Sequence, residues 1–125
     1  MGDPASRPQS VIGIVEDDPA VLHSLEFALQ AEGYLVSPLT SAEAHGSVGI
    51  LDVDCVIVDY GLCDGTGAAL LASLRERGLD CPAIVIASNP SRRCIEECRV
   101  AGAPLVEKPL MGDDLSAHIR SALAG

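Results

Sequence analysis

Short runs of apolar residues recur along the chain, and each is long enough for a strand but too short for a long helix. Four of them carry no charged or hydroxyl side chain, at positions 11–15, 55–58, 83–86 and 105–106. Such uninterrupted runs are typical of strands that are covered on both faces in a parallel sheet. A fifth, less regular strand is predicted over 34–38.

Helical spacing of apolar residues appears between these runs. The first helix begins at Pro19, a residue suited to a first helical position, and carries apolar residues at 21, 22, 25, 28 and 29 before it ends near position 33. The segment 40–43 has the spacing of a capping box, although glycines at 46 and 49 keep the helix that follows it short. Further helices are predicted between 66 and 78, over 91–101 and over 113–124.

The alternation of strands and helices predicts an α/β domain, because right-handed crossovers place helices on both faces of a parallel sheet. We expect the flavodoxin-like (βα)5 arrangement, a doubly wound five-stranded parallel sheet with the order 2-1-3-4-5. A length of 125 residues suits one domain, placed at 11–125 after a flexible tail over 1–10 that is rich in Gly, Pro and Ser. Met1 and a helix that ends at Ala124 favour an intact small protein.

Charge narrows the classes of partner. Eighteen acidic residues against eight basic ones give a formal net charge of −10. This charge repels nucleic acids and anionic membrane surfaces, so we expect neither as a partner. No apolar stretch reaches the ~18 residues of a membrane span, and no secretory signal is present, which favours a cytoplasmic protein. Five cysteines without a Cys-x-x-Cys pair favour reduced thiols.

Charged residues stand where three of the predicted strands end. Glu16 and Asp17 follow the first strand, Asp59 follows the third and Lys108 follows the fifth. In a doubly wound sheet the ligand site lies beyond the carboxyl ends of the strands, so these side chains are expected in one cleft. Neighbouring carboxylates need a cation, and oxygen ligands suit Mg²⁺. Such a site would let Asp59 attack phosphorus to form an acyl phosphate beside the Lys108 charge.

These residues lie in three of four motifs that resemble those of response-regulator receiver domains from two-component signalling. The motifs are Val-Glu-Asp-Asp at 15–18, Val-Asp-Tyr-Gly-Leu-Cys-Asp-Gly-Thr-Gly at 58–67, Ala-Gly at 101–102 and Glu-Lys-Pro-Leu at 107–110. Each motif is weak alone, but their order and their places at the ends of predicted elements make the set specific. The resemblance covers the chain from about Val11 to its end.

The resemblance implies a role for each site residue. Asp59 would be the phosphoacceptor, and Glu16 and Asp17 the acidic pair, with Asp17 the more direct Mg²⁺ ligand. The Gly61 carbonyl would be a further ligand. Lys108 would be the lysine that precedes a proline, here at position 109, whose peptide is often cis in such domains.

The resemblance also implies partners. A sensor histidine kinase or a phosphotransfer protein of a phosphorelay would donate the phosphoryl group, and the domain would show at most slow self-dephosphorylation rather than enzyme activity. A homodimer could form through the face of the fourth helix, fifth strand and fifth helix, where the basic segment at 91–93 is either a contact patch or simply a solvated face.

The sequence departs from the family pattern at three places. Ala87 stands where receivers carry a Thr or Ser, and Ser88 replaces it only if the register slips by one residue, which turns a side chain to the other face. Leu105 stands where an aromatic switch residue is usual, and Cys63 replaces a proline. We therefore expect phosphoryl acceptance with altered signalling, as a weakly switching partner, a phosphate shuttle or a phosphate sink.

Three alternatives belong to other classes of protein. One is a degenerate receiver that acts as a phosphorylation-independent interaction module, although Asp59 and Lys108 are both kept. Another is a Mg²⁺-dependent phosphatase that forms an aspartyl phosphate. Such enzymes generally need a second acid two positions after the nucleophile, where this chain has Gly61. The third, a flavodoxin-like cofactor binder, lacks a Gly-rich phosphate loop and has only three aromatic residues to stack on a flavin.

Overall fold

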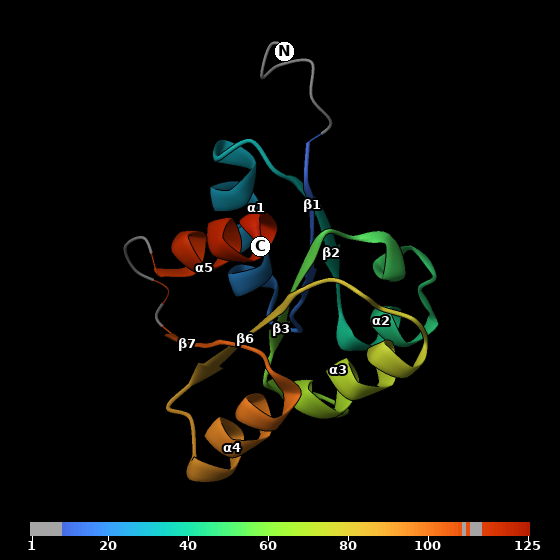
Figure 1. Cartoon of the computed structure of the whole chain (residues 1–125), viewed down its shortest axis with the longest axis vertical. Helices are drawn as coiled ribbons and strands as arrows, with labels where there is room; N and C mark the ends of the chain where they lie inside the picture. The colour runs from blue at the N-terminus through green and yellow to red at the C-terminus, as the bar shows by residue number, and fades with distance from the viewer. Residues whose placement is uncertain (1–8, 109, 111–113) are drawn as a thin grey trace.

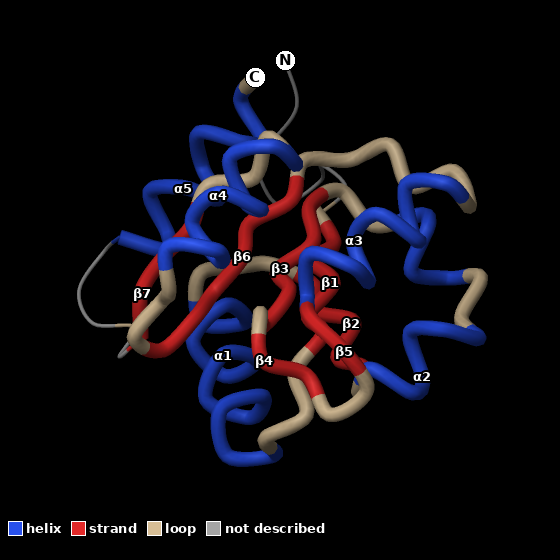
Figure 2. Tube along the Cα trace, turned by 90° about the horizontal axis from the view of Figure 1, so that it is seen from below, coloured by secondary structure: helices blue, strands red, loops and turns tan. Residues whose placement is uncertain are grey.

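The computed structural model describes residues 9–108, 110 and 114–125, and it has a central parallel sheet between two layers of helices (Figure 1). The five strands of this sheet are β1 (Val11–Val15), β2 (Leu35–Leu39), β3 (Cys55–Asp59), β6 (Ala83–Ser88) and β7 (Leu105–Lys108). Their order is β2-β1-β3-β6-β7, and Figure 2 shows them following one another across the molecule. Counted along the chain, this is the predicted order 2-1-3-4-5.

The five predicted helices are confirmed as α1 (Pro19–Ala31), α2 (Ser41–Gly46), α3 (Gly67–Glu76), α4 (Arg92–Ala101) and α5 (Asp114–Ala124). Apolar residues of α1 and α5 pack on one face of the sheet, and those of α2, α3 and α4 pack on the other. Strand residues alternate between these two cores, as expected for a sheet buried on both faces. No helix among the described residues is long and apolar enough to cross a membrane.

The helix ends follow the polar residues that the sequence offers. Asp18 accepts a hydrogen bond from the Ala20 N–H at the start of α1, so it caps this helix. The capping box of α2 is complete, since Thr40 and Glu43 each accept a bond from the other's backbone N–H. Gly102 ends α4 in the left-handed conformation that suits glycine. Position 113, where the last helix was predicted to begin, and the proline at 109 lie outside the described residues.

Two short elements were not predicted. A 3-10 helix spans Gly49–Asp52, and the loop after Asp59 pairs into a small hairpin of β4 (Gly61–Leu62) and β5 (Gly65–Thr66). Two-residue strands show no alternation that a sequence pattern can reveal. The strands β6 and β7 also extend two residues beyond their apolar runs. These extensions carry the sheet into the region where the charged residues gather.

Gly67 fits α3 closely against the end of β3. Its N–H donates to the Tyr60 carbonyl at 2.7 Å. A Cβ atom at this position would lie 2.2 Å from the Asp59 carbonyl oxygen, which no side-chain rotation can relieve. The residue that follows the hairpin must therefore be a glycine for α3 to begin so close to Asp59.

We expect Gly67→Ala to lower the free energy of unfolding by about 2 kcal/mol or more, because overpacking against backbone forces a shift of helix or strand. Urea unfolding followed by circular dichroism measures the loss. Gly46→Ala is the matched control, since a Cβ there meets no atom within 4 Å. Equal stability of the two variants would contradict the close packing of Gly67.

Candidate functional site

Alternation along three strands turns Glu16, Asp59 and Lys108 to the same side of the sheet. The residue two positions before each of them lies in the core formed with α1 and α5; these residues are Ile14, Ile57 and Val106. Side chains two apart in a strand share a face. The Glu16 N–H donates to the Leu39 carbonyl at 3.1 Å, so Glu16 continues the β1 ladder. The topology thus brings three charged groups to one point at the carboxyl edge of the sheet.

The Lys108 ammonium lies between two buried carboxylates. Its Nζ is 2.9 Å from Asp59 Oδ1 and 3.3 Å from Glu16 Oε2. Glu16 is only 2% exposed and Asp59 only 5%. Lys108 is the only lysine of the chain, so one cation serves both acids. The predicted association of Glu16, Asp59 and Lys108 is thus present in the structure.

Burial and charge shift the pKa values of this group. Burial raises the pKa of Glu16, the Asp18 N–H opposes this by donating to Glu16, and the Asp59 charge raises it further. Burial alone would lower the pKa of Lys108, but the hydrogen bond and charge of Asp59 outweigh it and leave that pKa raised. Lys108 therefore stays charged, whereas ionisation of Glu16 costs folding free energy.

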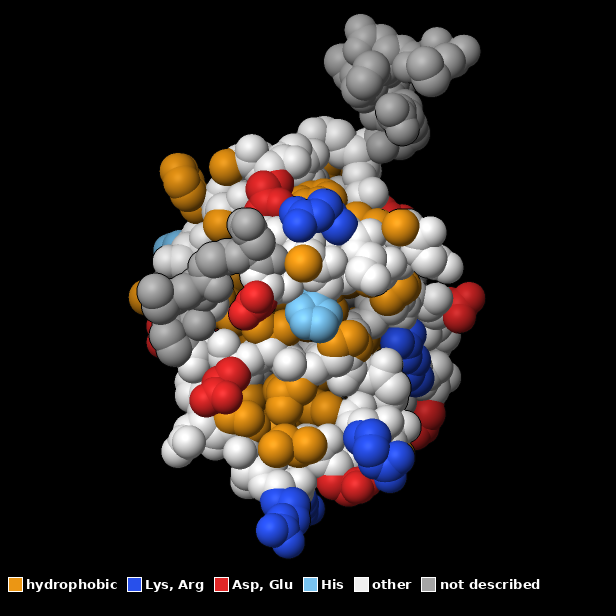
Figure 3. Space-filling model, turned by 60° about the vertical axis from the view of Figure 1, so that its left-hand side comes forward, with side chains coloured by type: hydrophobic (Ala, Val, Ile, Leu, Met, Phe, Trp, Pro, Cys, Tyr) orange, Lys and Arg blue, Asp and Glu red, His pale blue; other side chains and the backbone are white. Residues whose placement is uncertain are grey.

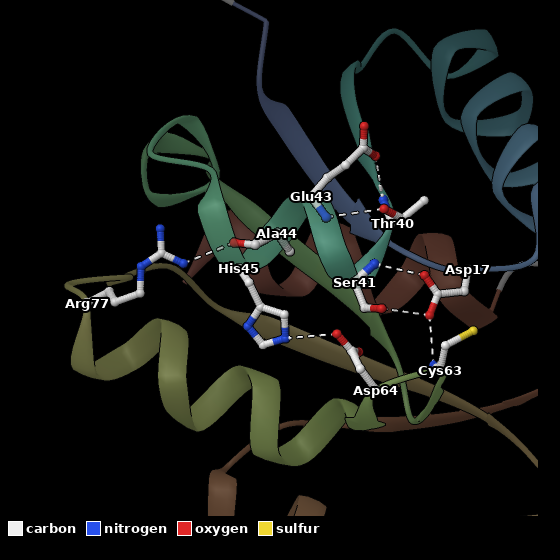
Figure 4. Close-up of polar contacts among 9 residues, drawn as sticks. All are labelled: Asp17, Thr40, Ser41, Glu43, Ala44, His45, Cys63, Asp64 and Arg77. Carbon is white, nitrogen blue, oxygen red and sulfur yellow. Dashed lines mark hydrogen bonds and ion pairs between the residues drawn. The ribbon is translucent and has the colours of Figure 1, made fainter.

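Asp17 lies with a different set of groups (Figure 4). Its Oδ1 accepts the Ser41 N–H at 2.8 Å, and its Oδ2 accepts the Ser41 hydroxyl at 2.8 Å and the Cys63 N–H at 2.9 Å. Burial would raise the pKa of Asp17, but the hydrogen bonds from Cys63 and Ser41 lower it overall. Glu16 and Asp17 are adjacent in sequence, yet their carboxylates have separate partners.

The segments that hold Asp17 are themselves tied together. His45 at the end of α2 lies 3.3 Å from Asp64 in the β4–β5 turn, and Figure 4 shows the two side chains facing each other. Arg77 of the next helix end donates to the Ala44 carbonyl at 3.0 Å and to the Ser47 carbonyl. Helix α2 and the β4–β5 hairpin are thus connected to each other beside Asp17.

The candidate ligands are of the chemical type that Mg²⁺ prefers, but their side chains are not arranged as a metal site. Glu16, Asp17, Asp59 and the Gly61 carbonyl are hard oxygen donors, and one ammonium leaves the carboxylates with excess negative charge. In the described part of the chain, however, no group of three or more His, Cys, Asp and Glu side chains could hold a metal ion.

The expected switch positions lie on both sides of β6. Ala87 is buried in the core beneath α3 and α4, with Leu105 packed against it. Ser88 is exposed and pairs in register with Lys108. Tyr60 also packs against this core, and its hydroxyl donates to Glu97 of α4. That bond, together with burial, raises the pKa of Tyr60 to about 12.

Sequence reasoning did not find the contacts of Ser41, Cys63, Tyr60 and Glu97. Three of them lie in loops or at helix starts, where no period marks a functional side chain. The capping box at 40–43 located the start of α2. It gave no sign that the next residue, Ser41, would also bind an acid 24 positions earlier.

Lys108→Met leaves two buried carboxylates without a cation, so we expect a loss of about 3 kcal/mol in the free energy of unfolding at pH 7.5. A carboxyl whose folded-state pKa is raised costs stability only when ionised. The loss therefore shrinks as the pH falls through the raised pKa of Glu16. Urea unfolding at pH 7.5 and pH 5 measures this loss.

The exposed Arg99 pairs with Glu96, so Arg99→Met is the control, and its free energy of unfolding should change little at either pH. A loss that is the same at both pH values would contradict this account.

Comparisons with known proteins agree with this arrangement. The model of the response regulator receiver domain family matches residues 12–120. The transcriptional regulatory protein KdpE of Staphylococcus aureus is 36% identical over 114 residues, which cover 90% of this chain and 49% of that protein. The transcriptional regulatory protein FixJ of Azorhizobium caulinodans is 31% identical, over 93% of this chain and 56% of FixJ. The chain thus spans about half the length of the curated relatives it matches.

The solved structures agree with the sequences. A CheY-like response regulator receiver domain protein from Methanospirillum hungatei superposes with a TM-score of 0.84 at 27% identity, covering 94% of this chain and 95% of that one. Members of this family are generally phosphoacceptors rather than enzymes, and they generally bind Mg²⁺ at the phosphorylation site. The family match over most of the chain, the related sequences and the shared fold lead to one conclusion: this protein belongs to the response regulator receiver domain family of two-component signalling.

Proposed function

We propose that this chain accepts a phosphoryl group on Asp59 from a phosphohistidine of a sensor histidine kinase or a phosphotransfer protein. The observation that carries the proposal is the contact of Lys108 with Asp59 and Glu16 at the carboxyl edge of the sheet. A carboxylate held at 2.9 Å from a lone ammonium has an adjacent charge for an arriving anion. The family membership supports the same chemistry.

In the proposed step, an Asp59 carboxylate oxygen attacks phosphorus. A P–O bond forms, the P–N bond of the donor phosphohistidine breaks, and its electron pair stays on the imidazole nitrogen. Lys108 keeps its charge, because its pKa is raised, and it pairs with a phosphoryl oxygen of the product. Glu16 then keeps the ammonium close to the reacting oxygen.

A Mg²⁺ ion, when bound, supplies further neutralisation of charge on the phosphoryl oxygens. Glu16, Asp17, Asp59 and the Gly61 carbonyl are the groups that would hold it. The excess of buried negative charge around Lys108 supports such a cation. Hydrolysis of the acyl phosphate is expected to be slow.

The output of this receiver is proposed to be altered. Ala87 offers no hydroxyl to the phosphoryl group, and Leu105 offers no ring to exchange between a buried and an exposed position. Receivers commonly use these two groups to carry the state of the site to their surface. We therefore propose a weakly switching partner, a phosphate shuttle or a phosphate sink. The phosphorylation-independent interaction module is the alternative that the same two residues favour.

Intact mass after incubation with acetyl phosphate tests acceptance. We expect one phosphoryl adduct in the wild-type protein with Mg²⁺, and none with EDTA or in Asp59→Asn. Asp64→Asn is the control, because Asp64 lies in the nearby turn and pairs with His45 instead of Lys108. An adduct that survives in Asp59→Asn would overturn the assignment. A wild-type protein that accepts from neither acetyl phosphate nor a histidine-kinase panel would favour the interaction module.

We also propose self-association through the face of α4, β7 and α5. Figure 3 looks at this side of the molecule and shows an area of hydrophobic side chains with basic and acidic groups around it. Two apolar residues of α4 are well exposed, Ile95 at 53% and Val100 at 74%. Receiver domains often dimerise, which supports the same proposal.

Sedimentation velocity tests the dimer. We expect Ile95→Glu to weaken association at least tenfold, because it would bury a charge in the interface. Phe27 of α1 is 77% exposed on a different helix, so Phe27→Glu is the control and should leave association unchanged. A wild-type protein that is monomeric at all concentrations, with and without phosphorylation, would exclude the dimer.

A further inference from the structure

The carboxylate of Asp17 is held by three donors that all come from one side. Two belong to Ser41, at the first position of α2, and the third is the Cys63 N–H in the β4–β5 turn. Figure 4 shows both segments meeting at this carboxylate. We call these three hydrogen bonds the Asp17 clamp. No hydrogen bond joins the clamp to Lys108, whose partners are Glu16 and Asp59.

The clamp occupies most of what Asp17 can offer a ligand. An ionised carboxylate has about four lone-pair sites, and three of them already accept hydrogen bonds. Each of these bonds is charge-assisted and short, between 2.8 and 2.9 Å. A cation that recruits Asp17 alongside Glu16 and Asp59 must therefore compete with protein donors as well as with water.

The clamp is built into the fold. Ser41 is 2% exposed and is fixed at the start of α2 by the capping box. The turn that carries Cys63 is fixed by the β4–β5 pairing and by the contact of Asp64 with His45. Neither donor can move away from Asp17 without breaking a second set of contacts. A proline at position 63 would have no N–H to donate.

We propose that Ser41 and the Cys63 N–H are positioning groups that hold Asp17 apart from Glu16 and Asp59 and thereby weaken the binding of divalent cations. This inference rests on the proposed function, since it concerns the cation of the phosphoacceptor site. In this proposal, the β4–β5 turn helps to set the fraction of the protein that has a bound cation at a given cation concentration. The Cys63 thiol also interacts with Asp17, so the variants below separate its effect from that of the N–H.

Calorimetric titration with Mg²⁺ tests the clamp through a pair of variants at one position. Cys63→Pro removes the N–H, whereas Cys63→Ala keeps the N–H and removes only the thiol. The extended conformation of Leu62 in β4 is compatible with a following proline. We expect the Mg²⁺ Kd of Cys63→Pro to fall about tenfold, because the cation no longer displaces a hydrogen bond to a charged group. Cys63→Ala loses only the thiol contact with Asp17, so it should change the Kd much less than Cys63→Pro does.

A second pair tests the clamp from α2. Ser41→Ala removes the hydroxyl bond to Asp17 and should also lower the Kd several-fold. Ser91→Ala removes a serine hydroxyl that caps α4 and has no contact with Asp17 or α2, so it should leave the Kd unchanged. Thermal unfolding by circular dichroism confirms that each variant is folded. If Cys63→Pro does not unfold cooperatively, the comparison of Ser41→Ala with Ser91→Ala decides.

The outcomes separate the inference from the function on which it rests. Weaker binding by Cys63→Pro than by Cys63→Ala would mean that the N–H orients Asp17 toward the cation, and it would overturn the inference. Equal binding by the two variants would also overturn it while leaving the cation site intact. Absence of Mg²⁺ binding in every protein would overturn the cation site itself, and the inference with it.

Discussion

The contact of one lysine with two buried acids is the constraint on which the rest of the site depends. Glu16 and Asp59 come from neighbouring strands and are nearly inaccessible to water. Two carboxylates so placed repel each other and lose their hydration, and the Lys108 ammonium is the charge that makes the arrangement tolerable. A negative excess remains after this pairing. This excess favours the binding of one more cation beside Asp59, the residue proposed to receive a phosphoryl group.

The sequence predicted most of the fold because the signals were strong and local. Continuous apolar runs gave the buried strands, and their alternation with amphipathic segments gave the topology. The charges after the strands then had only one edge of the sheet at which to meet. Glu16, Asp59 and Lys108 could be associated by this argument alone, and the structure has them in contact.

The direction of Asp17 could not be predicted in the same way. Once the strand ends, alternation no longer determines where a side chain points, and nearby donors decide instead. Ser41 and Cys63 reach Asp17 from segments 24 and 46 positions away. Their placement depends on a cap, a two-residue hairpin and a contact between His45 and Asp64. None of these contacts produces a periodic pattern in the sequence. From the sequence alone, Glu16 and Asp17 were therefore expected to act together.

The end of β3 joins the two cores of the protein. Asp59 faces the side of α1 and α5, whereas Tyr60 packs against the core on the side of α3 and α4, to which Ala87 belongs. The Tyr60 hydroxyl reaches Glu97, and its N–H donates to the Ile86 carbonyl at 2.8 Å. Two adjacent residues thus connect the Lys108 contact to a helix on the opposite face. In a receiver with alanine and leucine at the usual switch positions, this backbone link connects Asp59, the proposed phosphoacceptor, to α4.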